Sequence, residues 1–191
     1  NRFIVHASVV DAFADRITER VSAMALGRGT EPGVEIGPLI DEKAVAKASE
    51  LVADAVRRGA TVRTGGAVPE GEGTFYEPTV LVDVPASADI MREEIFGPVL
   101  AIASFTSEAE AVRLANDTEY GLVSYVFTQD LARGYRMIDL LETGMMGLNV
   151  GVVSNAAAPF GGVKQSGVGR EGGAEGIHEY LSTKYTLIPV D

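Results

Sequence analysis

Hydrophobic and polar positions alternate along the chain in blocks that predict strands followed by helices. The apolar run at residues 3–5 predicts a strand. Apolar side chains spaced three and four residues apart over residues 10–24 predict an amphipathic helix directly after it, with Ser8 and Asp11 forming its capping box. The chain therefore opens, on this pattern, with a strand that leads into a helix.

The same succession repeats further along. A second helix is predicted between Asp41, its N-cap, and Gly59, which ends it, and Ser107 with Glu110 forms a capping box for a helix after the apolar strand at residues 98–105. Because strands and helices alternate, we expect an α/β fold with right-handed crossovers and a mostly parallel sheet covered by helices on both faces. The other predicted elements are strands at residues 60–63, 79–84, 122–127, 145–148 and 185–190, helices at residues 131–141 and 174–180, and a turn or short helix at residues 87–92.

Composition narrows the possible functions. The 191 residues are 46% hydrophobic, enough for one compact core, and the net charge of -11 without a Lys/Arg-rich run argues against nucleic acid as a partner. No apolar run is long enough to span a membrane and no export signal opens the chain, so a cytoplasmic location is the default expectation. The sequence has no cysteine, and His6 and His178 lack metal-site spacing, so we predict neither a disulfide nor a metal site.

An acidic turn before the strand at residues 98–105 is the first candidate site. Within residues 92–98, Glu94 offers a carboxylate that can accept hydrogen bonds from a ribose diol, and Phe96 can lie against a planar ring. On spacing alone, a solvated acidic turn with Phe96 in the core is the commoner arrangement. The two interpretations both stay open at this point.

A glycine-rich stretch at residues 159–173 is the second candidate site. Its glycines, among them Gly161, Gly162, Gly167 and Gly169, predict a structured loop with positive φ angles or close backbone approach, without the spacing of a phosphate-binding loop. Just upstream, the Ser154 hydroxyl can hold a substrate carboxylate, because loops after parallel strands are where α/β proteins bind ligands. A Ser-Asn turn that caps its own backbone is the structural alternative.

Three sequence blocks resemble those of the aldehyde dehydrogenase superfamily and follow the same order. They are REEIFGP at residues 92–98, PFGG at residues 159–162 and KQSGVGRE at residues 164–171. The similarity extends over nearly the whole chain. GPLIDEKAV at residues 37–45, NDTEYGL at 116–122 and EYLSTKY at 179–185 look most like the succinate-semialdehyde dehydrogenases.

The resemblance implies a reaction and roles for four residues. In that family a cysteine thiolate attacks an aldehyde, the thiohemiacetal passes hydride to NAD or NADP, and a glutamate-activated water hydrolyses the thioester. By the match, Glu94 holds the nicotinamide-side ribose, Phe96 lies beside the nicotinamide, Phe160 forms a wall of the substrate funnel, and Ser154 binds the substrate carboxylate alongside arginines. The nucleophile and the general base match no position of this chain, so no catalytic residue is assigned within it.

The resemblance also implies a domain plan and a homo-oligomer. Residues 1–183 would be a portion of the catalytic domain, and residues 184–191 a strand that pairs with another subunit. Asn1 already stands within a strand pattern, so we expect a cut end and a fragment that oxidises no aldehyde alone. The alternatives are a non-catalytic binding or assembly module of the same fold and a dehydrogenase for another short semialdehyde; NAD and NADP, and dimer and tetramer, stay equally open.

Overall fold

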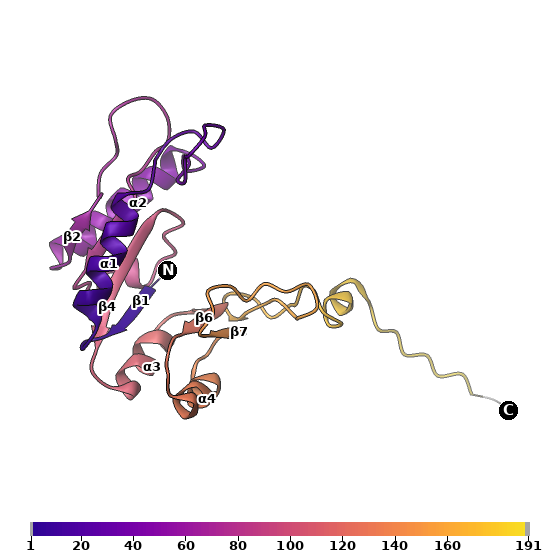
Figure 1. The fold of residues 1–191 in the computed structure, drawn as a ribbon. Helices are drawn as coiled ribbons and strands as arrows, with labels where there is room; N and C mark the ends of the chain where they lie inside the picture. Colours follow the sequence, from indigo (N-terminus) through magenta and orange to yellow (C-terminus); the bar gives the residue numbers. More distant parts are fainter. Residues whose placement is uncertain (1, 190–191) are drawn as a thin grey trace. The chain divides into compact units, whose positions relative to one another are not determined.

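The computed structural model describes residues 2–189 in two compact units, which divide between Leu114 and Ala115. The first unit contains a four-stranded sheet in the order β1-β4-β3-β2. Within it β1 and β3 run parallel to β4, whereas β2 pairs antiparallel with β3 at one edge and has an irregular register between Val62 and Thr64. The predicted α/β class with a mostly parallel sheet is confirmed (Figure 1). The strands are β1 (Arg2–His6), β2 (Thr61–Thr64), β3 (Thr79–Val82) and β4 (Val99–Phe105).

Two helices cover opposite faces of this sheet. Val80 and Ile102 pack with α1 (Val10–Ser22), whereas Leu81, the next residue along β3, packs with α2 (Glu42–Arg57). Successive strand residues point to opposite faces, so β3 is buried on both sides, and the three residues that follow Thr79 in it are all apolar. The expectation of helices on both faces is therefore correct for this unit.

The prediction of a capping box at the N-terminus of α1 is wrong. The N-cap is Val9, and its side chain makes no capping hydrogen bond. Ser8 instead donates its backbone N–H to Nδ1 of His6 at 3.1 Å, and its hydroxyl lies 2.8 Å from the same nitrogen. The histidine two residues upstream thus takes the groups that Ser8 would have used to cap the helix.

The structure confirms the predicted ends of α2 and the predicted N-cap of the next α-helix along the chain. Asp41 caps α2 by accepting a hydrogen bond from the N–H three residues later, and Gly59, with φ of 113°, follows its last turn. At α3 (Glu108–Asn116), the Glu110 N–H donates to the Ser107 hydroxyl at 3.3 Å, as a capping box requires. The Glu110 carboxylate, however, accepts hydrogen bonds from the N–H and hydroxyl of Thr106, which hold its pKa below the usual value.

The second unit is built around one parallel strand pair and one antiparallel pair. β6 and β7 run parallel and are joined by α4, which makes a βαβ crossover. β5 and β8 pair antiparallel and bring residues 120–121 beside residues 163–164. The bounds are β5 (Tyr120–Gly121), β6 (Val123–Val126), α4 (Leu131–Leu140), β7 (Met145–Leu148), β8 (Val163–Lys164), and two short 3-10 helices, η1 (Asp89–Met91) in the first unit and η2 (Gly176–Tyr180) in the second.

The end of the chain departs from the prediction. In place of a helix over residues 174–180 there is only the short η2, and residues 181–189 form no strand; Val190, the last residue of the predicted strand, lies outside the described part. A strand needs a neighbour to take its backbone hydrogen bonds, and none of the described residues pairs with this segment. Within residues 2–189, no helix has the length and apolar character to cross a membrane.

Candidate functional site

The loop at residues 92–98 presents Glu94 and Phe96 to solvent on either side of a buried anchor. Ile95 is 2% exposed and belongs to the core between α2 and the sheet, whereas Glu94 is exposed and Phe96 is 78% exposed. Phe96 adopts φ of 52°, a left-handed conformation that is uncommon for a residue with a side chain. The alternative of a core Phe96 is therefore wrong: the backbone turns the ring away from the core.

Hydrogen bonds hold this loop at both ends. The carbonyl of Asp89, in η1, accepts the N–H groups of Arg92 and Glu93, both at 2.9 Å. On the far side the carbonyl of Pro98 accepts the N–H of Thr79, on β3, at 2.8 Å. Glu94 and Phe96 thus lie on a short segment whose two ends are tied to the fold.

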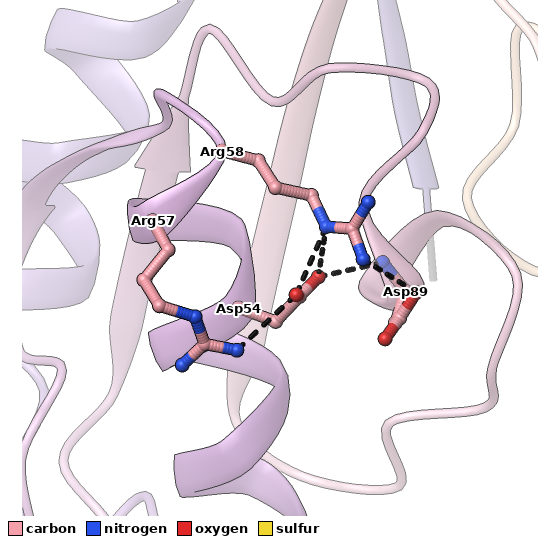
Figure 2. Close-up of polar contacts among 4 residues, drawn as sticks. All are labelled: Asp54, Arg57, Arg58 and Asp89. Atoms are coloured by element: carbon pink, nitrogen blue, oxygen red, sulfur yellow. Dashed lines mark hydrogen bonds and ion pairs between the residues drawn. The ribbon is translucent and has the colours of Figure 1, made fainter.

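A polar cluster links α2 to η1 just before this loop (Figure 2). Asp54, only 7% exposed, accepts hydrogen bonds from Nε of Arg58 at 2.8 and 2.9 Å and from the backbone N–H of Asp89 at 3.0 Å. Arg58 reaches the Asp89 carboxylate at 3.3 Å, and Arg57 approaches Asp54 from the other side at 3.3 Å. The Asp89 N–H and the Arg58 guanidinium together lower the pKa of Asp54, against the opposing effect of burial.

In the second unit, Phe160 is held in place by a two-residue β-bridge. Its N–H and carbonyl exchange hydrogen bonds with the carbonyl and N–H of Glu171 at 2.7 and 2.8 Å. The guanidinium of Arg170 donates to the carbonyls of Gly162 at 2.7 Å and Gly169 at 2.9 Å, and to that of Val168. The glycine-rich stretch is therefore a structured loop, as predicted.

Both close backbone approach and positive φ account for the glycines of residues 159–173. Gly167, Gly172 and Gly173 have positive φ, of 90°, 66° and 59°. At Gly161 a Cβ would lie 2.3 Å from the Gly169 carbonyl oxygen, and at Gly144 it would lie 2.2 Å from the Gly161 carbonyl oxygen. Neither site has room for a side chain, so the loop packs backbone against backbone.

Lys164 connects two of the sequence blocks. Its ammonium donates to the carbonyls of Asn116 and Thr118, both at 3.2 Å, and forms an ion pair with Glu142. The Ser166 hydroxyl accepts the N–H of Gly121 at 3.0 Å. Residues 116–122 and 164–171, far apart in sequence, are thus neighbours within the second unit.

Ser154 is exposed and directly precedes a turn that Asn155 organises. The Asn155 side chain accepts the N–H of Ala157 at 3.0 Å, so the self-capping turn foreseen as an alternative belongs to Asn155, and the Ser154 side chain is exposed beside it. Ser154 and Phe160 both belong to the second unit, and Glu94 and Phe96 to the first. The described residues contain no group of three or more His, Cys, Asp and Glu side chains suited to a metal ion.

Comparisons with known proteins agree on one family. The model of the aldehyde dehydrogenase family matches residues 1–186. The NADP(+) succinate-semialdehyde dehydrogenase GabD of Escherichia coli is 50% identical over 188 residues, which are 98% of this chain and 39% of that protein. A glutarate-semialdehyde dehydrogenase of Pseudomonas aeruginosa is 51% identical over 188 residues, 98% of this chain and 39% of that protein. The crystal structure of a succinate-semialdehyde dehydrogenase from Burkholderia pseudomallei is 51% identical and aligns with a TM-score of 0.91 over 94% of this chain and 37% of that one.

Proposed function

Because the chain belongs to the aldehyde dehydrogenase family, we propose that it is part of an NAD(P)-dependent enzyme that oxidises a short semialdehyde, in the first place succinate semialdehyde, to the carboxylate. The observation that carries this proposal is the 50–51% identity, over 98% of the chain, to relatives named for succinate and glutarate semialdehyde. Those two substrates differ by one methylene and share an aldehyde at one end and a carboxylate at the other. The chain spans 39% of the length of these relatives, and we infer that other residues of the enzyme supply the remainder of the active site.

We assign Glu94 and Phe96 to the cofactor. Supporting this, an exposed carboxylate can accept hydrogen bonds from both hydroxyls of a ribose, and an exposed ring can lie against a nicotinamide. The two side chains are separated by a buried residue on a loop whose two ends are fixed by hydrogen bonds, so they are preorganised to bind a ligand. When bound, NAD or NADP supplies the acceptor for the hydride that leaves the substrate.

We assign Ser154 and Phe160 to the substrate. An exposed hydroxyl can donate a hydrogen bond to the carboxylate of a semialdehyde, and an aromatic ring can line the path of its methylene chain. A carboxylate is bound more strongly with a cation beside it. Arg170 is already engaged with the carbonyls of its own loop, so it is not assigned this role, and we expect at least one such arginine to come from outside this chain.

The oxidation also needs a nucleophile and a base. The sequence contains no cysteine, so we propose that the thiolate that forms the thiohemiacetal, and the glutamate that activates water, come from the rest of the enzyme. In this proposal the present chain binds and orients cofactor and substrate, and by itself oxidises no aldehyde. Formation of NAD(P)H by the purified chain alone would contradict that part.

We further propose that residues 184–191 serve the oligomer, as a unit separate from residues 1–183. Three apolar side chains in this segment, Tyr185, Leu187 and Ile188, are exposed, and an extended segment completes its backbone hydrogen bonds by pairing with another chain. Removing residues 184–191 from the complete enzyme should then lower its oligomeric state, as measured by light scattering. An unchanged molar mass would contradict this assignment.

The substrate proposal is tested on the complete enzyme. Succinate semialdehyde is compared with butanal, which has the same number of carbons and no carboxylate, in the presence of NAD or NADP. We expect kcat/KM to be about 100-fold higher for the semialdehyde, because the polar groups that bind its carboxylate have no hydrogen-bond partner when the neutral aldehyde is bound. Equal values would remove the semialdehyde assignment, and a lack of NAD(P)H with any aldehyde would favour the non-catalytic module of the same fold.

A further inference from the structure

We propose that Asp54 is a positioning residue for the cofactor loop: it fixes η1 and, through it, residues 92–98, which carry Glu94 and Phe96. This inference rests on the proposed function, because it concerns the same cofactor-binding loop. Asp54 itself lies on α2 and is not assigned to any ligand.

The connection between Asp54 and the loop runs through the backbone of one residue, Asp89. The Asp54 carboxylate accepts the N–H of Asp89 at 3.0 Å, and the carbonyl of Asp89 accepts the N–H groups of Arg92 and Glu93, both at 2.9 Å. Arg58 completes the link, since it binds Asp54 through Nε and the Asp89 carboxylate through a terminal nitrogen (Figure 2). The residue held by Asp54 is thus the one whose carbonyl binds the first two residues of the loop.

Burial makes this link more specific than a surface ion pair. The side chain of Asp54 is only 11% exposed, whereas those of Arg58 and Asp89 are 41% and 51% exposed. A shielded carboxylate whose hydrogen bonds all go to one short helix and two arginines holds a defined geometry, because removing one partner leaves the others unsatisfied. Ile90 and Met91 are both buried and hold η1 in the same core. Their packing fixes the orientation of η1, and the hydrogen bonds of the Asp54 carboxylate fix its position.

Glu94 and Phe96 themselves are exposed, and the loop near them is pinned by Ile95 and by its two ends. A shift of η1 is therefore transmitted to Glu94, one residue beyond the hydrogen-bonded Glu93. Cofactor binding should be sensitive to such a shift, because a small misplacement of a positioning group has a large effect on binding and rate. Substrate binding, which is assigned to Ser154 and Phe160, should not be affected by a shift of η1.

The test compares Asp54→Ala with Asp54→Asn and Arg57→Ala in the complete enzyme. Asn keeps an oxygen that can accept the Asp89 N–H, and Arg57 contacts Asp54 at 3.3 Å without a contact to Asp89, so these two serve as conservative variant and matched control. We expect Asp54→Ala to raise KM for NAD(P) about three- to tenfold, with KM for the aldehyde unchanged, and the two other variants to stay within about twofold of wild type. Hydrogen exchange at the Arg92 and Glu93 amides should rise in Asp54→Ala.

Two outcomes overturn the inference. If Asp54→Ala lowers the melting temperature but leaves KM for the cofactor and amide exchange in the loop as in wild type, Asp54 only stabilises the fold. If Glu94→Gln, made in parallel, does not raise KM for the cofactor, the proposed role of Glu94 fails, and the inference built on it fails for that separate reason. Should Asp54→Ala not fold, Arg58→Ala tests the same link, with the same expected rise and the same refuting result.

Discussion

The left-handed conformation of Phe96 predicts a conflict between stability and cofactor binding. Phe96 has φ of 52° and is 78% exposed, so its backbone strain is not offset by burial of the ring. A left-handed conformation costs about 1–2 kcal/mol for a residue with a Cβ, and glycine avoids this cost. Glycine loses roughly 0.5–1 kcal/mol more backbone entropy on folding than alanine. The difference between the midpoints of these two ranges gives glycine a net advantage over alanine of about 0.75 kcal/mol at this position.

Two variants isolate the backbone effect. Phe96→Ala and Phe96→Gly both remove the ring, and only the second also removes the strain. We expect Phe96→Gly to melt about 1–4 °C above Phe96→Ala. Circular dichroism is the suitable probe, because the sequence has no tryptophan. In the complete enzyme both variants should raise KM for NAD(P) to a similar extent, since both lack the ring proposed to lie beside the nicotinamide.

The reasoning fails if glycine proves no more stable than alanine at position 96. In that case the turn would not be strained, and the backbone of residue 96 would not need a ligand contact to explain its geometry. If the glycine variant is the more stable but KM for the cofactor is unchanged in both, the strain is real and the assigned role of the ring is wrong. The two measurements therefore test the conformation and the function separately.

Three further predictions concern other parts of the fold. Thr79→Val should lower the free energy of unfolding, measured with urea, by about 1–3 kcal/mol, because the buried Thr79 hydroxyl accepts the Gly66 N–H at 2.8 Å and valine has no acceptor. Thr79→Ser keeps the hydroxyl and should lower it by less. A larger loss for serine would mean that packing of the methyl group decides the stability. Gly144→Ala should disorder the glycine loop, since its Cβ would lie 2.2 Å from the Gly161 carbonyl oxygen, and unchanged protease resistance of the loop would contradict this. The lowered pKa of Glu110 stabilises the fold fully above the usual pKa of 4.5, and this contribution is lost as the pH falls through the lowered pKa. Glu110→Gln should therefore flatten the dependence of the melting temperature on acid pH. An unaltered pH profile would refute the assignment.

The strand–helix succession could be predicted because it depends on local periodicity. The apolar spacing of residues 10–24 and the apolar run at residues 80–82 of β3 both follow directly from the faces they bury. The cap of α1 could not be predicted from Ser8, because His6 competes for the same groups. A terminal strand at residues 185–190 could be read only as a propensity, since pairing requires a neighbour that the sequence does not specify.

The candidate residues were found by resemblance, and their supporting contacts were not. Asp54 lies on α2 and Arg58, four residues later, is the C-cap of that helix, a spacing that signals an ion pair, but nothing in the sequence pointed to Asp89, 35 residues beyond Asp54. Spacing alone favours a core position for Phe96, because aromatic side chains are more often buried, and only the family resemblance points to an accessible ring. Its conformation is a property of the folded loop.

The irregular register of β2 has a consequence for how the protein behaves at high concentration. β2 lies at the edge of the sheet, where unpaired backbone groups offer a template for strands of other molecules. The strand is only four residues long, its pairing is interrupted between Val62 and Thr64, and it carries Arg63 in an ion pair with Asp15 of α1. A short, irregularly paired and charged edge is a poor partner for an incoming strand, so we expect this side of the sheet to resist edge-to-edge aggregation.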